Sequence, residues 1–189
     1  MQPTRDEAWK LLNEFTSNPS LIKHGLGVEA AMRAYARFFD EDEEEWGIVG
    51  LIHDFDYEQN PTEETHLHVG CGILRDRGWP EEMVLAVASH ADYMEVARDR
   101  PLRRSLFAVD ELSGFLTACA LVRPDKSITD VRIKSVKKKL KDKAFARGVN
   151  REDVYSGAEA LERDLGEHIE FVRDAMATIS GELGLPPSA

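Results

Sequence analysis

Apolar side chains recur every three or four positions along most of this chain, the spacing that places them on one face of an α-helix. The clearest run starts at Leu21 and continues through His24, Val28, Ala31 and Tyr35. No stretch alternates apolar and polar residues with the two-residue period of a strand over the length that a strand needs. The pattern therefore predicts an all-α fold.

Capping residues and prolines indicate where these helices begin and end. Thr4 and Glu7 form a capping box, Ser20 is placed to cap the second helix, and the acidic residues 40–45 suit the positive end of a helix dipole. The last five residues are expected to be loose. The later helices are expected at about residues 66–77, 80–90, 101–124, 130–141 and, as a pair opened by Asn150 and Asp153, 150–183.

Length and composition predict a single domain. The chain has 189 residues, and a hydrophobic content of 42% is enough for a core. No repeat, low-complexity linker or shift in composition marks a boundary. We therefore predict one domain over residues 1–189, with its core at about 20–122 and a C-terminal helical extension at about 125–185.

Charge and hydropathy limit the kinds of binding partner that we expect for this protein. A net charge of −11 is the opposite of the basic footprint of a nucleic-acid binder, although a small anionic substrate stays compatible with it. The N-terminus lacks the apolar core of a signal peptide, and no stretch reaches the ~20 apolar residues of a membrane span. We expect a cytoplasmic protein without a membrane partner, in which Cys71 and Cys119 are buried thiols. The sequence makes no prediction about oligomeric state.

Four histidines and two aspartates stand at helix ends or on apolar faces: His24, His53, Asp54, His66, His90 and Asp110. Neighbours such as His53 and Asp54 point ~100° apart within a helix, so they can converge only where the backbone turns at its end. Asp110 lies in an apolar helix, where its carboxylate needs a metal, a proton or a partner such as Arg103 or Arg104. A single histidine of this kind is more often a core residue, and only the ordered set favours a metal site.

The order His24, His53-Asp54, Asp110 resembles the signature of the HD-domain superfamily of metal-dependent phosphohydrolases. His66 with Gly70, followed by a G-x-P-E-E turn and a helix ending at His90, is similar to another segment of that family. The resemblance covers about residues 20–115, and the remainder is similar to a bacterial group of predicted hydrolases. It implies an HD-domain-like helical bundle with extra C-terminal helices, in which His68 is a neighbour of the site rather than a ligand.

The resemblance also implies a ligand set and a reaction. His24, His53, Asp54 and Asp110 would hold one metal, and Asp54 would bridge to a second metal held by His66 and His90. Mixed imidazole and carboxylate ligands suit one or two divalent transition metals among Fe, Mn, Zn, Ni and Co. A metal-activated hydroxide would then hydrolyse a small phosphate ester, a nucleotide-like phosphomonoester or phosphodiester, with Asp54 as a catalytic residue.

The residues after Asp54 depart from some relatives, which carry a lysine three positions beyond this aspartate where Tyr57 stands here. Asp56 is the candidate replacement. It is expected to be catalytic, as a proton donor to the leaving group, or to order a metal ligand. Its alternative role is to cap a loop.

Residues 134–147 hold seven lysines and arginines in an otherwise acidic chain. Lys134, Lys137, Lys138 and Arg104 are the candidates for binding a substrate phosphate. The alternative is a solvated basic face paired with acidic helices. Three arginines are rival candidates for binding the phosphate: Arg98, Arg100 and Arg103. The sixth histidine, His168, is expected to lie at the surface or to pack in the core.

Two other functions stay open at this point. The six-ligand set also resembles di-iron oxygenases on the same scaffold, which would show two irons, substrate-dependent oxygen uptake and no phosphatase activity. A non-catalytic nucleotide-binding regulatory module would instead bind a nucleotide tightly without turnover.

Overall fold

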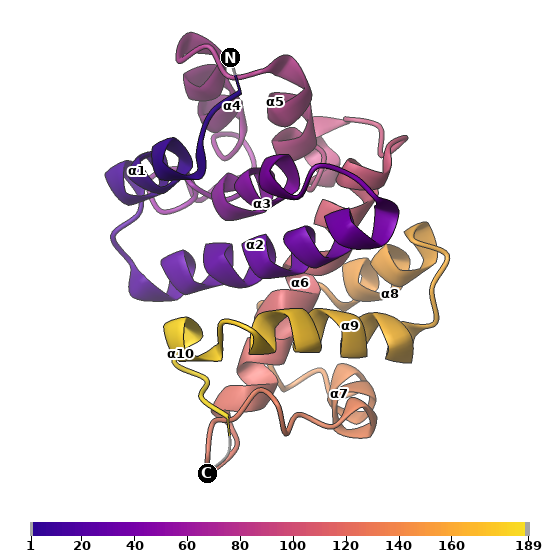
Figure 1. Ribbon diagram of the computed structural model, residues 1–189. Helices are drawn as coiled ribbons and strands as arrows, with labels where there is room; N and C mark the ends of the chain where they lie inside the picture. Colours follow the sequence, from indigo (N-terminus) through magenta and orange to yellow (C-terminus); the bar gives the residue numbers. More distant parts are fainter. Residues whose placement is uncertain (1, 188–189) are drawn as a thin grey trace.

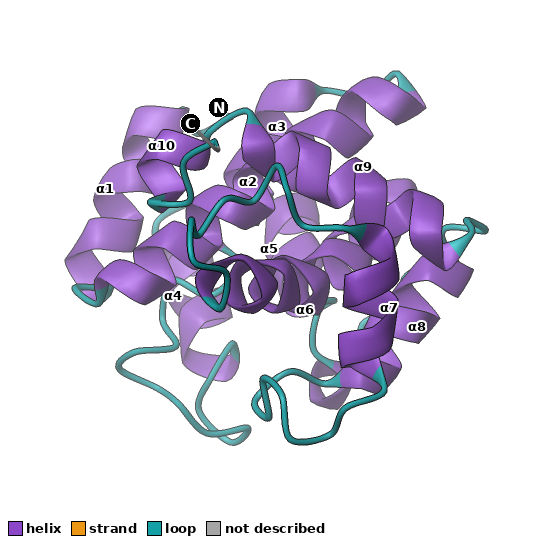
Figure 2. Ribbon diagram, turned by 90° about the horizontal axis from the view of Figure 1, so that it is seen from below, coloured by secondary structure: helices purple, strands orange, loops and turns teal. Residues whose placement is uncertain are grey.

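The computed structural model describes residues 2–187, and these residues form helices and loops without a strand (Figure 2). This confirms the predicted all-α fold. A short 3-10 helix covers Asp92–Met94. The α-helices are α1 (Arg5–Phe15), α2 (Pro19–Phe39), α3 (Glu43–Ile52), α4 (His68–Asp76), α5 (Glu81–Ala88), α6 (Pro101–Leu121), α7 (Ile133–Leu140), α8 (Arg151–Ala160), α9 (Leu165–Ala177) and α10 (Ser180–Leu183).

Three of the predicted helix starts are confirmed by their hydrogen bonds. Thr4 and Glu7 make the reciprocal capping box of α1. Asp42 caps α3, and three glutamates follow it in the first turn. The side chain of Asn150 accepts from the backbone N–H of Glu152 at the start of α8.

Other boundaries differ from the prediction for local reasons. Asn18, not Ser20, caps α2, because Pro19 occupies the first helical position. A proline suits this position because a backbone N–H there would have no acceptor within the helix. His66 lies before α4 rather than inside it, and Pro80 is the cap of α5 rather than its first residue. The tail is not loose at Leu185, which is buried, and residues 188–189 lie outside the described part of the chain.

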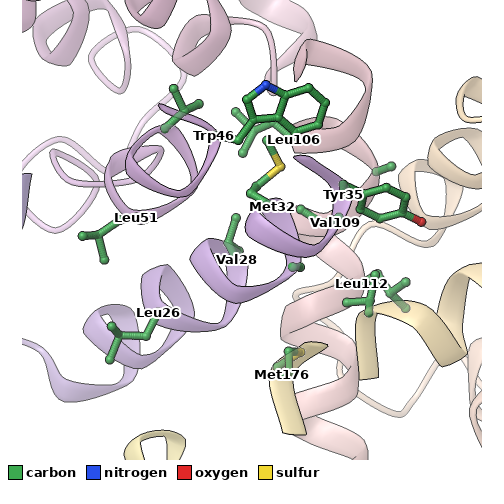
Figure 3. Close-up of a cluster of buried hydrophobic side chains, with 14 of the residues drawn as sticks. Leu26, Val28, Met32, Tyr35, Trp46, Leu51, Leu106, Val109, Leu112 and Met176 are labelled. Carbon is green, nitrogen blue, oxygen red and sulfur yellow. The ribbon is translucent and has the colours of Figure 1, made fainter. Parts of the chain in front are cut away.

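The helix α2 runs through the middle of the molecule, with α3 on one side, α9 on the other and α6 crossing behind it (Figure 1). Figure 2 looks along α6, around which the other helices gather. The buried core between them is apolar, and Figure 3 shows Met32 of α2 between Trp46 of α3 and Leu106 and Val109 of α6. This packing brings parts of α2, α3 and α6 that are far apart in sequence into contact.

The C-terminal helices pack against this core. α8 lies close on α6, since a Cβ added to Gly157 would be 2.6 Å from the Cα of Ala108. α9 packs against both α2 and α6. His168 of α9 is fully buried, where its Nε2 donates to the carbonyl of Ala108 at 2.9 Å and its Nδ1 accepts from the hydroxyl of Tyr35 at 2.6 Å. His168 is therefore a packing residue that joins three helices.

Two further expectations concern the cysteines and the membrane. Cys71 and Cys119 are both buried and not paired with each other, as predicted. Within residues 2–187, no helix combines the length and apolar character that a membrane crossing requires.

Candidate metal centre

Helices α2, α3 and α6 bring the first group of predicted ligands together. His24 lies on α2, His53 caps the C-terminus of α3, and Asp110 lies on α6. The Nε2 atoms of His24 and His53 are 3.2 Å apart, and they lie 2.9 and 3.3 Å from Oδ1 of Asp110. Asp54 completes the group, whose donor atoms all lie within 4.8 Å of one another.

Asp54 also belongs to a second group of donors. Its Oδ1 lies 3.2 Å from Nε2 of His66 and 3.3 Å from Nε2 of His90. Its Oδ2 faces the first group, at 3.5 Å from Nε2 of His53 and 3.9 Å from Nε2 of His24. One carboxylate therefore stands between two sets of imidazoles. The structure brings all six predicted ligands together, as the sequence indicated.

The donor atoms are spaced as ligands of a transition metal would be. Bonds of about 2.0–2.2 Å to nitrogen and oxygen place neighbouring ligand atoms roughly 3.0–3.5 Å apart in tetrahedral or octahedral geometry. Most of the donor separations given above lie within or near this range. Mixed imidazole and carboxylate donors suit divalent transition metals rather than Mg or Ca. The residues present therefore fit one or two such ions.

Hydrogen bonds fix which nitrogen of three histidines faces the centre. Nδ1 of His53 and of His90 each donates to the backbone carbonyl three residues earlier, at 2.8 and 2.7 Å. Nδ1 of His66 faces Oδ1 of Asp56 at 3.0 Å. Because a carbonyl oxygen only accepts, Nδ1 of His53 and of His90 carries a proton, and Nε2 is the nitrogen whose lone pair a metal would use. Each Nε2 is thus turned toward Asp54 as a ready ligand.

The electrostatics of the centre favour positive charge between its carboxylates. Burial by itself would lower the pKa of His53, but Asp54 and Asp110 raise it well above the ordinary value. Burial opposes the shift of His66 as well, yet Asp54 and Asp56 raise its pKa to about 9. Although burial would raise the pKa of Asp54 and Asp110, the neighbouring histidines hold it well below its usual range. A site with this preference is suited to a cation.

A cavity of about 800 Å³ opens above the two donor groups. Its wall includes the aromatic rings of Tyr57, Tyr93 and Phe107. Among the lining residues of the described chain there is neither a lysine nor an arginine. Six lining residues are instead acidic: Asp54, Glu63, Asp92, Asp110, Glu111 and Asp153.

The residues predicted to bind a substrate phosphate are not among those that line this cavity, so their predicted role stays a prediction. None of Lys134, Lys137, Lys138 and Arg104 lines it. The lysines lie on α7, which packs against α6 and α9, and Nζ of Lys137 is 3.7 Å from Asp164 at the start of α9. For Lys137, the alternative of a solvated face paired with acids therefore fits better.

The rival arginines are held by carboxylates. Asp92 pairs with Arg98 at 2.6 Å, and the Arg98 guanidinium stacks on Phe107, 3.6 Å from its ring centroid. Arg100 and Arg103 both pair with Glu82. Arg103 is thus engaged away from Asp110, whose partners are histidines.

Asp56 is placed differently from the predicted proton donor. Its side chain is fully buried and does not line the cavity, so it cannot reach a leaving group there. It faces His66 and the start of α4 instead, which favours its other predicted role, the ordering of a metal ligand. His68 is exposed and belongs to neither donor group, as expected of a neighbour.

Several wall residues escaped the sequence interpretation, most clearly on α6. Phe107, Glu111 and Gly114 all line the cavity, and their spacing of four and three residues places them on one helical face. Burial, followed by the charge of Asp110, raises the pKa of Glu111 to about 7. A second acid beside Asp110 in an apolar helix was the available signal.

This all-helical protein gathers four imidazoles around a shared carboxylate, in two groups of donors that could hold a metal. The comparison with protein-family models matches the HD domain over residues 21–115, half of the chain. The chain therefore belongs to the HD-domain superfamily, whose members are generally metal-dependent phosphohydrolases. The comparisons with curated proteins and with solved structures gave no match.

Proposed function

We propose that this protein is a metal-dependent phosphohydrolase that cleaves a small phosphate ester, a nucleotide-like phosphomonoester or phosphodiester. The observation that carries the proposal is the position of Asp54, whose two carboxylate oxygens face separate groups of imidazole nitrogens. Divalent metals bound there supply polarisation of the phosphoryl group and activation of water for attack. His24, His53, Asp54 and Asp110 would hold one ion, and His66, His90 and Asp54 the other.

The remaining side chains orient the ligands and shape the cavity. The contacts at Nδ1 hold the imidazoles of His53, His66 and His90 in place. The acidic wall leaves the charge of a phosphoryl group to be neutralised at the metal centre. Beyond that group, the ionised carboxylates of the wall accept hydrogen bonds and repel further phosphates. We therefore expect a substrate with one phosphate and a leaving group rich in hydroxyl or amino groups.

The proposal is tested by metal analysis of the purified protein followed by a screen for phosphate release. The screen should include nucleoside monophosphates, cyclic and linear diesters, sugar phosphates, amino-alcohol phosphates and nucleoside triphosphates. We expect bound transition metal and faster release from monophosphates than from triphosphates. Asp54→Ala should lose metal and turnover together, whereas His68→Ala, next to the site but outside both donor groups, should keep both.

Two results would replace the proposal. Full metal content and turnover in Asp54→Ala would show that the assignment of the centre is wrong. Two irons with substrate-dependent oxygen uptake and no phosphate release would identify an oxygenase on the same scaffold.

A further inference from the structure

The carboxylate of Asp56 connects a metal ligand with the start of a helix. Its Oδ1 lies 3.0 Å from Nδ1 of His66. Its Oδ2 accepts from the backbone N–H of Leu67 at 3.2 Å and of Gly70 at 3.0 Å. The whole side chain is buried, so these three groups are the partners that satisfy it.

His66 needs such a partner because of its position in the chain. His53 and His90 follow the last turns of α3 and α5, where backbone carbonyls are free to accept from a side chain. His66 precedes α4, so it has no helix end behind it. The carboxylate of Asp56 accepts from Nδ1 of His66, as a backbone carbonyl at a helix end does for Nδ1 of His53 and of His90.

We propose that Asp56 is a positioning residue that holds the proton of His66 on Nδ1 and thereby creates the second metal-binding group. The inference rests on the proposed two-metal centre. It adds that Asp56 is needed for the second group of ligands, to which His66 belongs. Oδ2 is engaged by two backbone donors, so Oδ1 is the oxygen left for His66. With the proton on Nδ1, Nε2 keeps the lone pair that faces Asp54 at 3.2 Å.

Gly70 is part of the same arrangement. A Cβ at this position would lie 2.6 Å from Cγ of Asp56 and 2.8 Å from both of its oxygens. Only a glycine therefore lets the first turn of α4 approach the buried carboxylate closely enough to donate to it. This accounts for a glycine four residues after the ligand His66.

The substitution Asp56→Asn separates the two tasks of this side chain at nearly constant size. If the amide oxygen faces the N–H groups of Leu67 and Gly70, the amide nitrogen donates to Nδ1 of His66. The proton of His66 then moves to Nε2, where it blocks metal binding. The opposite orientation would set the amide N–H groups against two backbone donors, which is the costlier choice because both would be left unsatisfied.

The test is calorimetric titration of the metal-free protein with Mn²⁺. We expect two metals in the wild type and, in Asp56→Asn, a retained first site with the affinity of the second about 10–100-fold weaker. Combining Asp56→Asn with His66→Ala should weaken the second site no further than His66→Ala does. The matched control is Asp42→Asn, because Asp42 also accepts from two backbone N–H groups at a helix start but touches no histidine. It should leave both sites unchanged.

An unchanged second-site affinity in Asp56→Asn would overturn the inference and leave the proposed function standing. A wild-type protein that binds no metal would overturn the proposed function as well. ¹⁵N NMR of the zinc-loaded wild type tests the inference without any variant that could fail to fold. A proton on Nδ1 of His66 is the expected result, and an Nδ1 without a proton would overturn it.

Discussion

At the scale of single residues, the partner of each ring nitrogen separates the structural histidine from the candidate ligands. His168 uses both nitrogens for the protein, one for Tyr35 and one for the carbonyl of Ala108. His53 and His90 use only Nδ1 for a backbone carbonyl and keep Nε2 for the centre. A histidine whose two ring nitrogens are both hydrogen-bonded to buried protein groups has no nitrogen lone pair left to bind a metal.

His168 should make the stability of the fold depend on pH. Burial lowers its pKa to about 4, so between pH 6.5 and 4 the unfolded chain binds more protons than the folded one. Stability from this residue is present above pH 6.5 and is lost as the pH falls, by roughly 2 kcal/mol at pH 5. Urea unfolding of the metal-free wild type and of His168→Gln should show their difference shrinking by that amount from pH 7.5 to 5. Parallel curves would show that His168 is not held neutral in the fold.

At the scale of helices, close approach of α2 and α3 brings His24 to His53. Gly25 and Gly50 make this approach possible. A Cβ on Gly25 would lie 2.8 Å from the carbonyl oxygen of Leu51, and one on Gly50 would meet α2 at about 3 Å. The first metal group therefore depends on two residues that carry no side chain.

The substitution Gly50→Ala should weaken that group without touching a ligand. Its Cβ would lie 2.9 Å from Cγ of Met32 and 3.0 Å from the carbonyl oxygen of Val28, so α3 has to move away from α2. We expect the free energy of unfolding to fall by about 1–3 kcal/mol and the affinity of the first metal site to fall with it. The control is Gly72→Ala in α4, where a Cβ would meet nothing within 4 Å. It should gain about 0.5–1 kcal/mol from helix propensity and keep its metal affinity. Urea unfolding and metal titration measure both quantities, and equal behaviour of the two variants would contradict the explanation.

At the scale of the whole molecule, the basic residues of α7 lie apart from the cavity in which they were expected to bind phosphate. The basic helix α7 packs beside α6 and α9, whereas the cavity over the metal centre has an acidic wall. Phosphate binding should therefore depend on bound metal rather than on protein cations.

The simultaneous change of Lys134, Lys137 and Lys138 to Gln should accordingly leave catalysis intact. We expect kcat and KM for the ester identified by the screen to stay within about twofold of the wild type, because exposed charges outside the cavity are screened by salt. Steady-state kinetics at physiological ionic strength is the measurement. A KM raised severalfold with unchanged kcat would return these lysines to the substrate site.

The six candidate ligands could be selected from the sequence and its family resemblance, whereas the surroundings of these residues could not be predicted. The sequence shows His53 and Asp54 at the end of an apolar helix and Asp110 within another apolar helix. The ordering of a metal ligand by Asp56 was one of several roles that the sequence left open. Which ligand it contacts depends on the turn that brings residues 66–70 back onto this carboxylate. The position of the α7 lysines could not be predicted for a similar reason, since a run of like charges does not indicate the side of the molecule on which it lies.

The sequence by itself determined most of the helices, three of their N-terminal caps and the family to which the chain belongs. Hydrophobic periodicity and capping act over a few residues, so they can be read without knowing what a helix packs against. Only the tertiary structure decided which oxygen of Asp54 faces which histidines, which nitrogen of each ligand is tied down, and that the cavity wall is acidic. These features arise where helices distant in sequence meet, because distances of about 3 Å between such side chains depend on packing and not on local pattern.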